Sequence, residues 1–203
     1  MKRPRFGTRR PFILGLTGSI GMGKSAVAKM FEAEGVPVFD ADACVHALQG
    51  PGGRLVAAIE RRFPGTTGPG GVDRAKLGAI VLGNRAELAA LEHIVHPAVA
   101  RERHLFLRRH AARALVVLDI PLLFEKKGWK SVGAIAVVSA PPWVQRRRVL
   151  TRPGMSAAKY RAILRLQVPD HIKRARADFV IPTGHLKSRT REQVRAIVSC
   201  FRG

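Results

Sequence analysis

The sequence contains few cysteines and no long apolar run, and each shortage excludes a class of protein. Only two cysteines, Cys44 and Cys200, occur among the 203 residues, and neither lies in a CxxC or histidine-rich pattern. This argues against a disulfide framework and favours a reducing, cytoplasmic setting. No apolar run approaches the roughly 18 residues that would suggest a membrane-spanning helix, so we expect no membrane partner.

Acidic and aromatic residues are also scarce. The chain has 14 Asp and Glu against 36 Lys and Arg, which gives a formal net charge of +22. Such a charge attracts polyanions of any kind, including nucleic acids, nucleotides and CoA-type phosphates, and it does not separate them. Only nine Phe, two Trp and one Tyr are present, without a motif for stacking single-stranded bases. We therefore expect no specific nucleic-acid partner.

Short apolar runs alternate with segments of helical length. Five runs are continuous rather than alternating, as is typical of parallel strands that are covered on both faces, and they are residues 12–16, 36–39, 115–118, 134–138 and 179–181. The segment 24–34 after the first run has apolar residues on one helical face at Val27, Met30 and Phe31. This alternation predicts an α/β doubly wound fold.

Two long stretches do not follow this alternation. Residues 41–112 lack a strong strand and contain four helix-like segments, at 54–63, 73–82, 85–95 and 98–112, so we expect a helical insertion. Residues 141–177 are helical in pattern and rich in Arg, so we expect a mobile helical lid. One domain, 1–203, is predicted, with a core of 12–40, 113–140 and 178–203 and a basic N-terminal arm of 1–11.

The strongest motif is the octapeptide from Gly18 to Ser25, which matches GxxxxGK[ST] in full and follows an apolar strand. Glycines at 18, 21 and 23 allow the backbone N–H groups to approach phosphates, and the next helix directs its positive end at the anion. Lys24 adds a charge on the β- and γ-phosphates, and the Ser25 hydroxyl is a ligand for magnesium. The predicted ATP-binding residues are Gly18, Ser19, Ile20, Gly21, Met22, Gly23, Lys24, Ser25 and Ala26.

ATP is favoured over GTP because the chain has no Asn-Lys-x-Asp tetrapeptide, the motif that reads guanine. The fold class is accordingly α/β with a P-loop NTPase-type parallel sheet flanked by helices, and the cofactors are ATP and Mg²⁺.

Carboxylates follow two of the predicted strands. Asp40 and Asp42 end the second strand, where one can accept the proton of an attacking hydroxyl while the other caps the next helix, and we favour Asp42 as the base. Asp119 follows the third strand and either holds magnesium through water or caps the next turn. His93 and His96 lack a third ligand, which argues against a metal site there.

Beyond the P-loop, the order and spacing of several segments resemble the dephospho-CoA kinase family over nearly the whole chain. The matching segments are 15–25, 39–42, 91–97, 119–125, 145–148 with Arg152, Gln167, and 177–181. The resemblance implies ATP-dependent phosphorylation of the ribose 3′-hydroxyl of dephospho-CoA, which yields CoA and ADP in the last step of CoA synthesis. It also implies a nucleotide-binding core, a helical CoA-binding insertion and a lid.

The resemblance also implies roles for individual residues. Asp42 resembles the catalytic base, Lys24 the phosphate-binding lysine, and Arg148 and Arg152 the lid arginines that close over the phosphates. Ser25 and Asp119 are the expected metal-binding residues. The expected substrate-binding residues are Asp42, His96, Pro97, Leu122, Leu123, Phe124 and Glu125.

Two departures from the family pattern and two alternatives stay open. Ser19 stands where the family commonly has Gly, and Pro182-Thr183-Gly184 replaces a segment where many members carry an Asn. Another small-molecule P-loop kinase would share the core and lid, whereas a nucleic-acid-binding ATPase would use the +22 charge. We expect a monomer or a weak homo-oligomer.

Overall fold

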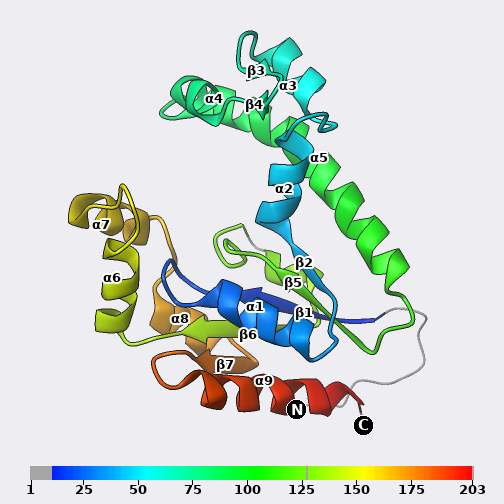
Figure 1. Ribbon diagram of the computed structural model, residues 1–203, viewed down its shortest axis with the longest axis vertical. Coiled ribbons are helices and arrows are strands. Elements are labelled where there is room, and N and C mark those ends of the chain that lie inside the picture. The colour runs from blue at the N-terminus through cyan, green and yellow to red at the C-terminus, as the bar shows by residue number, and fades with distance from the viewer. Residues whose placement is uncertain (1–10, 127, 203) are drawn as a thin grey trace. The chain divides into compact units, whose positions relative to one another are not determined.

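The computed structural model describes residues 11–126 and 128–202. Contacts divide the chain into two compact units. One consists of residues 40–109, and the other consists of the described residues up to 39 together with those from 110 onward. The second unit is built on a five-stranded sheet with the strand order β2-β5-β1-β6-β7 (Figure 1). The predicted α/β fold, with a largely parallel sheet flanked by helices, is confirmed.

Strand β1 (Phe12–Thr17) lies at the centre of the sheet, between β5 (Leu115–Asp119) and β6 (Ala134–Ser139), and it runs parallel to both. Every residue of β5 is buried, which explains its continuous apolar sequence. The register pairs Leu16 with Asp119. The end of β1, where the glycine-rich loop begins, therefore lies beside the only charged residue of β5.

The sheet is completed by β2 (Val38–Asp40) next to β5 and by β7 (Phe179–Pro182), which runs parallel to β6. The second predicted strand, 36–39, is thus displaced toward its carboxyl end. Pro37 precedes β2 and has no N–H to donate, but its carbonyl accepts a hydrogen bond from the Val117 N–H at 2.9 Å.

Helices α1 (Lys24–Ala33) and α9 (Lys187–Arg202) pack against each other along the sheet (Figure 1). Their buried side chains, which include Phe31 and Phe201, join the sheet residues Leu14 and Leu16 in one apolar core. The rings of Phe12 and Phe201 lie 4.7 Å apart between centroids. This core fixes the start of α1, and hence the glycine-rich loop, relative to the sheet.

Three helices follow β6, within the segment where a lid was predicted. They are α6 (Pro142–Leu150), α7 (Ala157–Arg165) and α8 (Asp170–Ala175), and a short 3-10 helix, η1 (Gly128–Ser131), precedes β6. Helix α6 contacts α7, and α8 packs against β6. Ser156 caps α7 by accepting a hydrogen bond from the Lys159 N–H at 3.2 Å.

The unit of residues 40–109 has an apolar core of its own, formed by Leu48, Leu55, Ile59, Phe63, Leu77 and Val81. Helix α4 begins after Asp73, whose carboxylate accepts hydrogen bonds from the N–H groups of Ala75 and Lys76. The elements of this unit are α2 (Ala41–Gln49), α3 (Val56–Arg62), β3 (Thr67–Gly68), β4 (Gly71–Val72), α4 (Arg74–Val81) and α5 (Arg85–Arg109).

Two details of this unit differ from the sequence prediction. The two helices predicted at 85–95 and 98–112 are one continuous helix, α5, with Pro97 inside it. Pro97 has no N–H for the carbonyl of His93, but both residues are exposed, so water can hydrogen-bond that carbonyl. The glycine-rich segment between α3 and α4 also forms a short antiparallel hairpin, β3 with β4, in which Thr67 pairs with Val72.

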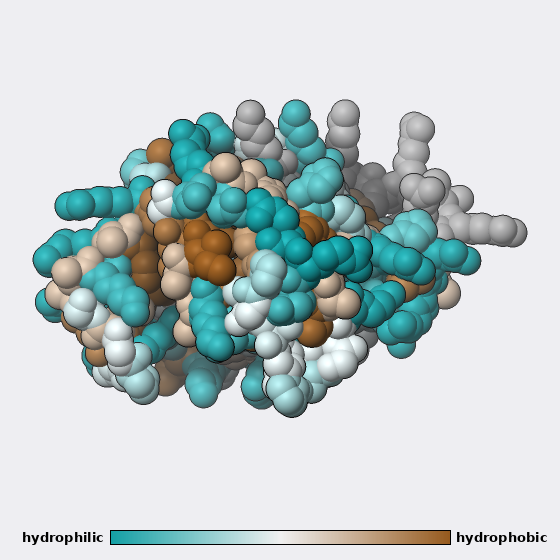
Figure 2. Space-filling model, turned by 90° about the horizontal axis from the view of Figure 1, so that it is seen from above, coloured by the Kyte–Doolittle hydropathy of each residue, from teal (hydrophilic) through white to brown (hydrophobic). Residues whose placement is uncertain are grey.

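The surface reflects the excess of basic residues. Figure 2 shows long hydrophilic side chains across one face, with smaller apolar areas between them. Within residues 11–126 and 128–202, no helix is both long enough and apolar enough to cross a lipid bilayer.

Candidate active site

The glycine-rich loop joins β1 to the N-terminus of α1. Helix α1 begins at Lys24 after Gly23, which has a φ of 90°, and no side chain caps its first turn. The N–H groups of that turn therefore have no side-chain acceptor and carry the positive end of the helix dipole. A phosphate group is the ligand that such a helix start binds best.

Glycines in the loop are also required by what packs behind it. A Cβ atom at Gly18 would lie 2.7 Å from the Val138 carbonyl oxygen. At Gly21, whose φ is +77°, it would lie 2.5 Å from a methyl group of Val149. These glycines are expected from the sequence to let phosphate approach the backbone, and in the structure β6 and α6 also press against the loop from the protein side.

Lys24 and Asp119 form an ion pair. The parallel register of β1 and β5 places Asp119 beside the loop, and its side chain is 1% exposed, against 16% for Lys24. A carboxylate at this position holds the lysine ammonium at the mouth of the loop. An incoming phosphate offers the same ammonium a second anionic partner, since a lysine can donate to several acceptors at once.

Two oxygen donors suited to a magnesium ion are Asp119 of this pair and Ser25, the residue after Lys24. Ser25 is exposed in the first turn of α1, next to Lys24, and Asp119 provides a carboxylate. Mg²⁺ prefers such hard oxygen ligands and usually completes its shell with water and substrate phosphates, so two protein groups fit it. A site built from protein ligands alone is absent from the described part of the chain, where no cluster of three or more His, Cys, Asp or Glu occurs.

Of the two candidate lid arginines, Arg148 contacts the loop region. Its guanidinium donates to the Thr183 hydroxyl at 3.1 Å and to the Thr183 carbonyl at 2.6 Å. That hydroxyl donates in turn to the Met22 carbonyl. Arg148 lies 3.3 Å from where a Cβ of Gly23 would stand, whereas Arg152 is exposed just beyond α6. A series of hydrogen bonds thus runs from Arg148 of α6 through Thr183 to Met22 of the phosphate loop.

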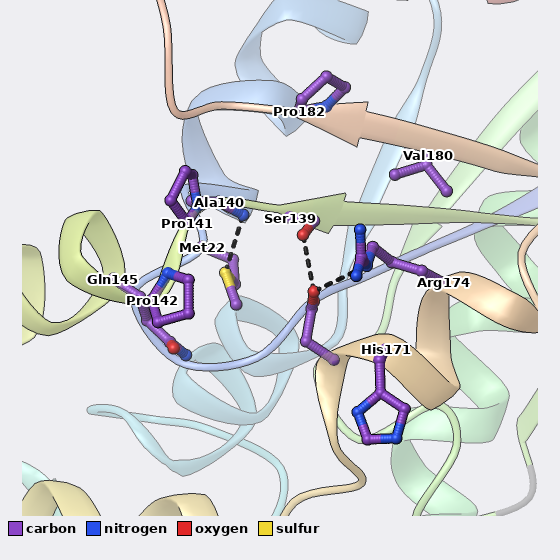
Figure 3. Close-up of a pocket in the computed structure, with 11 residues that line it drawn as sticks. Met22, Ser139, Ala140, Pro141, Pro142, Gln145, His171, Arg174, Val180 and Pro182 are labelled. Atoms are coloured by element: carbon purple, nitrogen blue, oxygen red, sulfur yellow. Dashed lines mark hydrogen bonds and ion pairs between the residues drawn. The ribbon is translucent and has the colours of Figure 1, made fainter.

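A pocket of about 470 Å³ adjoins the loop, and Met22 and Gln145 form part of its wall (Figure 3). Its polar groups largely pair with one another, since Asp170 accepts from the Ser139 hydroxyl at 2.7 Å and from the Arg174 guanidinium at 3.2 Å. The Ala140 N–H donates to the Met22 sulfur at 3.1 Å. The residues of β6, α6 and α8 that line this pocket lie beside the loop, and the Ala140 N–H contacts it at Met22.

The segment after β5 contains four of the predicted substrate-binding residues, in different environments. Leu122 is exposed, whereas Leu123 and Phe124 are buried in the interior. Glu125 forms an ion pair of 2.8 Å with Lys173, which is fully buried, and it accepts a hydrogen bond from the Val168 N–H at 2.8 Å. Burial by itself would raise the pKa of Glu125, but the Lys173 ammonium and the Val168 N–H outweigh it and hold the pKa below its ordinary value.

The remaining predicted residues belong to the unit of residues 40–109. Asp40 caps α2, because its carboxylate accepts a hydrogen bond from the Ala43 N–H at 2.9 Å. Asp42 is exposed in the first turn of that helix. His96 and Pro97 are exposed in the middle of α5. Both aspartates are exposed, and they differ in that the Asp40 carboxylate is engaged in the cap of α2, whereas Asp42 lies in the first turn of that helix.

Comparison with known proteins gives the family. The family model of dephospho-CoA kinase matches residues 12–187. The chain belongs to the dephospho-CoA kinase family. The reaction of this family is the final step of coenzyme A biosynthesis, and the family assignment suggested by the sequence segments is confirmed.

Individual relatives agree with the family assignment. A dephospho-CoA kinase of Novosphingobium aromaticivorans is 61% identical over 95% of this chain and 96% of its own length. One of Zymomonas mobilis is 51% identical over 94% and 97%. A crystal structure of a Thermus thermophilus protein has a TM-score of 0.84 at 36% identity and covers 96% of this chain and 100% of its own. The dephospho-CoA kinase of Campylobacter jejuni shares the fold, with a TM-score of 0.64 at 22% identity over 94% and 98%.

Two residues that shape this site carry no local signal in the sequence for the part they play. Thr183 was noted only as a departure from the family, yet it joins Arg148 to Met22. Lys173 gave no signal at all, because a lysine in a basic helical segment is ordinarily solvated. Both depend on contacts between distant segments, which local patterns do not contain.

Proposed function

We propose that this chain catalyses the reaction of its family and transfers the γ-phosphoryl group of ATP to the ribose 3′-hydroxyl of dephospho-CoA, giving CoA and ADP. The observation that carries this proposal is the uncapped start of α1 behind the glycine-rich loop, with Lys24 held beside it by Asp119. This arrangement suits a triphosphate, which backbone N–H groups and one ammonium would bind together.

Binding of ATP uses the loop from Gly18 to Ala26. Its N–H groups donate to the phosphates, and the Lys24 ammonium shifts from Asp119 toward the β- and γ-phosphates, where it offsets negative charge. Ser25 and Asp119 are the residues that would hold Mg²⁺. The ion, when bound, neutralises charge on the phosphates.

Transfer of the phosphoryl group needs a base for the acceptor hydroxyl, and we assign this role to Asp42. Asp40 is engaged in the cap of α2, whereas Asp42 lies two residues further on, exposed in the first turn of the helix. The 3′-oxygen forms the new bond to the γ-phosphorus, the bond from that phosphorus to the β–γ bridging oxygen breaks, and the proton passes to Asp42.

The remaining predicted residues divide into contact and support roles. Arg148 and Arg152 offer planar guanidinium groups to the phosphates as charge spreads during transfer. His96, Pro97 and Leu122 are exposed and suited to contact the CoA portion. Leu123, Phe124 and Glu125 support the segment after β5, which carries Leu122, from the interior of the larger unit.

Replacing the proposed base tests this mechanism. The Asp42→Asn variant is expected to lose about 10²- to 10⁴-fold in kcat, since it removes a general base, while its affinity for ATP stays within about twofold. Steady-state kinetics with dephospho-CoA and calorimetric titration with ATP measure the two effects. Asp40→Asn is the matched control, because asparagine caps a helix as well as aspartate. Near-normal turnover of Asp42→Asn would refute the assignment.

The acceptor is tested separately with the unmodified protein. Turnover of dephospho-CoA is compared with turnover of nucleoside monophosphates and sugar acids at equal ATP concentration. Turnover of another acceptor without turnover of dephospho-CoA would reject the function while leaving the ATP site intact.

We also propose a cytoplasmic setting, with which the two free cysteines, Cys44 and Cys200, agree.

A further inference from the structure

The backbone of Ile20, in the middle of the phosphate loop, is held on both sides by side chains from distant segments. Its N–H donates to the Gln167 side-chain oxygen at 3.1 Å, and its carbonyl accepts from the Gln145 side-chain nitrogen at 2.8 Å. Gln145 belongs to α6 and is 5% exposed, and Gln167 lies between α7 and α8. In Figure 3, Gln145 lies close to the phosphate loop.

The two glutamines have opposite hydrogen-bonding roles, and the backbone determines which is which. A peptide N–H can only donate, so the atom of Gln167 that meets it must be the amide oxygen. A peptide carbonyl can only accept, so the atom of Gln145 that meets it must be the amide nitrogen. The same substitution at both positions therefore has different consequences.

The Ile20 carbonyl and the Gly21 N–H belong to one planar trans peptide unit and point in opposite directions. Gly21 has a φ of +77°, and glycine adopts either sign of φ readily, so the backbone torsion at Gly21 offers little resistance to this unit turning over. Turning over would present a carbonyl oxygen, instead of an N–H, to the phosphates. A donor on the Ile20 carbonyl opposes that rotation.

The other glycine of positive φ in the phosphate loop, Gly23, has the same arrangement. Gly23 follows Met22, whose carbonyl accepts a hydrogen bond from the Thr183 hydroxyl. Each of the two turned glycines is thus preceded by a carbonyl that a side chain from another segment holds. The repetition argues for a device that fixes the direction of the loop N–H groups, in addition to ordinary packing.

We propose that Gln145 and Gln167 are positioning residues, which hold two successive peptide units of the phosphate loop so that the Gly21 N–H faces the nucleotide. The inference rests on the proposed binding of ATP by this loop. These two hydrogen bonds also couple nucleotide affinity to the position of α6, which carries Gln145, and to the position of the segment between α7 and α8, which carries Gln167.

The test replaces each glutamine by glutamate and by methionine and measures ATP affinity by calorimetry at pH 8. In Gln145→Glu, a carboxylate faces the Ile20 carbonyl oxygen, and the two acceptors repel each other. We expect about a 30-fold loss of affinity, against about tenfold in Gln145→Met, which lacks the donor but adds no charge. In Gln167→Glu the carboxylate still accepts the Ile20 N–H, so we expect a loss of only about threefold, and a larger one in Gln167→Met.

Lowering the pH adds a readout that a packing role would not change. Protonation turns the carboxyl of Gln145→Glu into a donor, so its affinity should rise toward or above that of Gln145→Met as the pH falls to about 5.5. Asp170, His171 and Arg174 line the same pocket as Gln145. Because both variants share these groups, the ratio of their affinities at each pH isolates the introduced carboxyl.

Kinetic constants and thermal unfolding complete the test. KM for ATP should rise in Gln145→Met while KM for dephospho-CoA stays the same, with the melting temperature as a check on folding. Equal losses in Gln145→Glu and Gln167→Glu, or unchanged affinity in Gln145→Met, would overturn the proposal. If the unmodified protein binds ATP but does not phosphorylate dephospho-CoA, the proposed function fails and the two glutamines are still judged by ATP affinity.

Discussion

Two lysine–carboxylate pairs in the larger unit have the same chemistry and different environments. Lys24 pairs with Asp119 at the end of β5, and Lys173 pairs with Glu125 six residues further along the chain. Lys24 is 16% exposed beside the phosphate loop, whereas Lys173 is fully buried. Only the first ammonium can be reached by a phosphate, so burial separates a functional pair from a structural one.

The buried pair is the more consequential one for stability. Removing two charges from water is costly, and their attraction compensates only when both partners are present. Glu125 also accepts the Val168 N–H, so the pair connects the segment after β5 to the one between α7 and α8. The adjacent residue of that segment, Gln167, contacts the phosphate loop. The buried pair is thus connected to the phosphate loop through two adjacent residues, Val168 and Gln167.

Loss of one partner of the buried pair should have the largest effect. Lys173→Met leaves the Glu125 carboxylate without its cation, so we expect the free energy of unfolding to fall by about 3–5 kcal/mol in urea titration. The double variant Lys173→Met with Glu125→Gln removes both charges and keeps an acceptor for the Val168 N–H. Its stability should lie well above that of the single variant. If both are equally unstable, the pair is not the cause.

The matched change at the functional pair should affect catalysis instead. Lys24→Arg keeps a cation beside Asp119, so we expect a change of less than about 1 kcal/mol in stability. We expect kcat/KM to fall about 100-fold, or about 2.7 kcal/mol, because a planar guanidinium does not replace a compact ammonium at a phosphate. Steady-state kinetics and urea unfolding separate the two quantities. An active Lys24→Arg enzyme would contradict the assigned role.

Acid should weaken the buried pair selectively. The pKa of Glu125 in the folded protein lies below its ordinary value of 4.5, so the unfolded state binds the proton more readily. Its contribution to stability is therefore complete above the ordinary pKa and is lost as pH falls through the lower, folded value. Unfolding titrations between pH 3 and pH 7 should show this loss in the natural sequence, and the double variant at 125 and 173 should lack it.

An exposed pair should have the smallest effect. The Arg195 guanidinium donates to Glu34 at 2.7 Å between α9 and the end of α1, with side-chain exposures of 61% and 18%. Arg195→Gln should change the free energy of unfolding by about 0.2–1 kcal/mol, and salt should reduce the difference further. A change as large as that of Lys173→Met would show that exposure does not rank these pairs.

Much of the nucleotide site could be predicted from the sequence because its physics is local. Gly18, Gly21 and Gly23, the lysine and the serine lie within eight residues, and the helix that follows supplies the dipole. The contacts behind the loop could not be predicted in this way. Gln145 and Gln167 meet Ile20 across 125 and 147 positions of the chain, and Thr183 reaches Met22 across 161.

The sequence by itself determined the α/β fold from its apolar runs, the phosphate loop from a continuous motif, and the family from the order and spacing of several segments. The tertiary structure decided which charges are buried and which side chains hold the loop. The register of β1 with β5 puts Asp119 beside Lys24, and the packing of α8 removes Lys173 from water. Such outcomes depend on distances between segments, which the chain acquires only when its core forms.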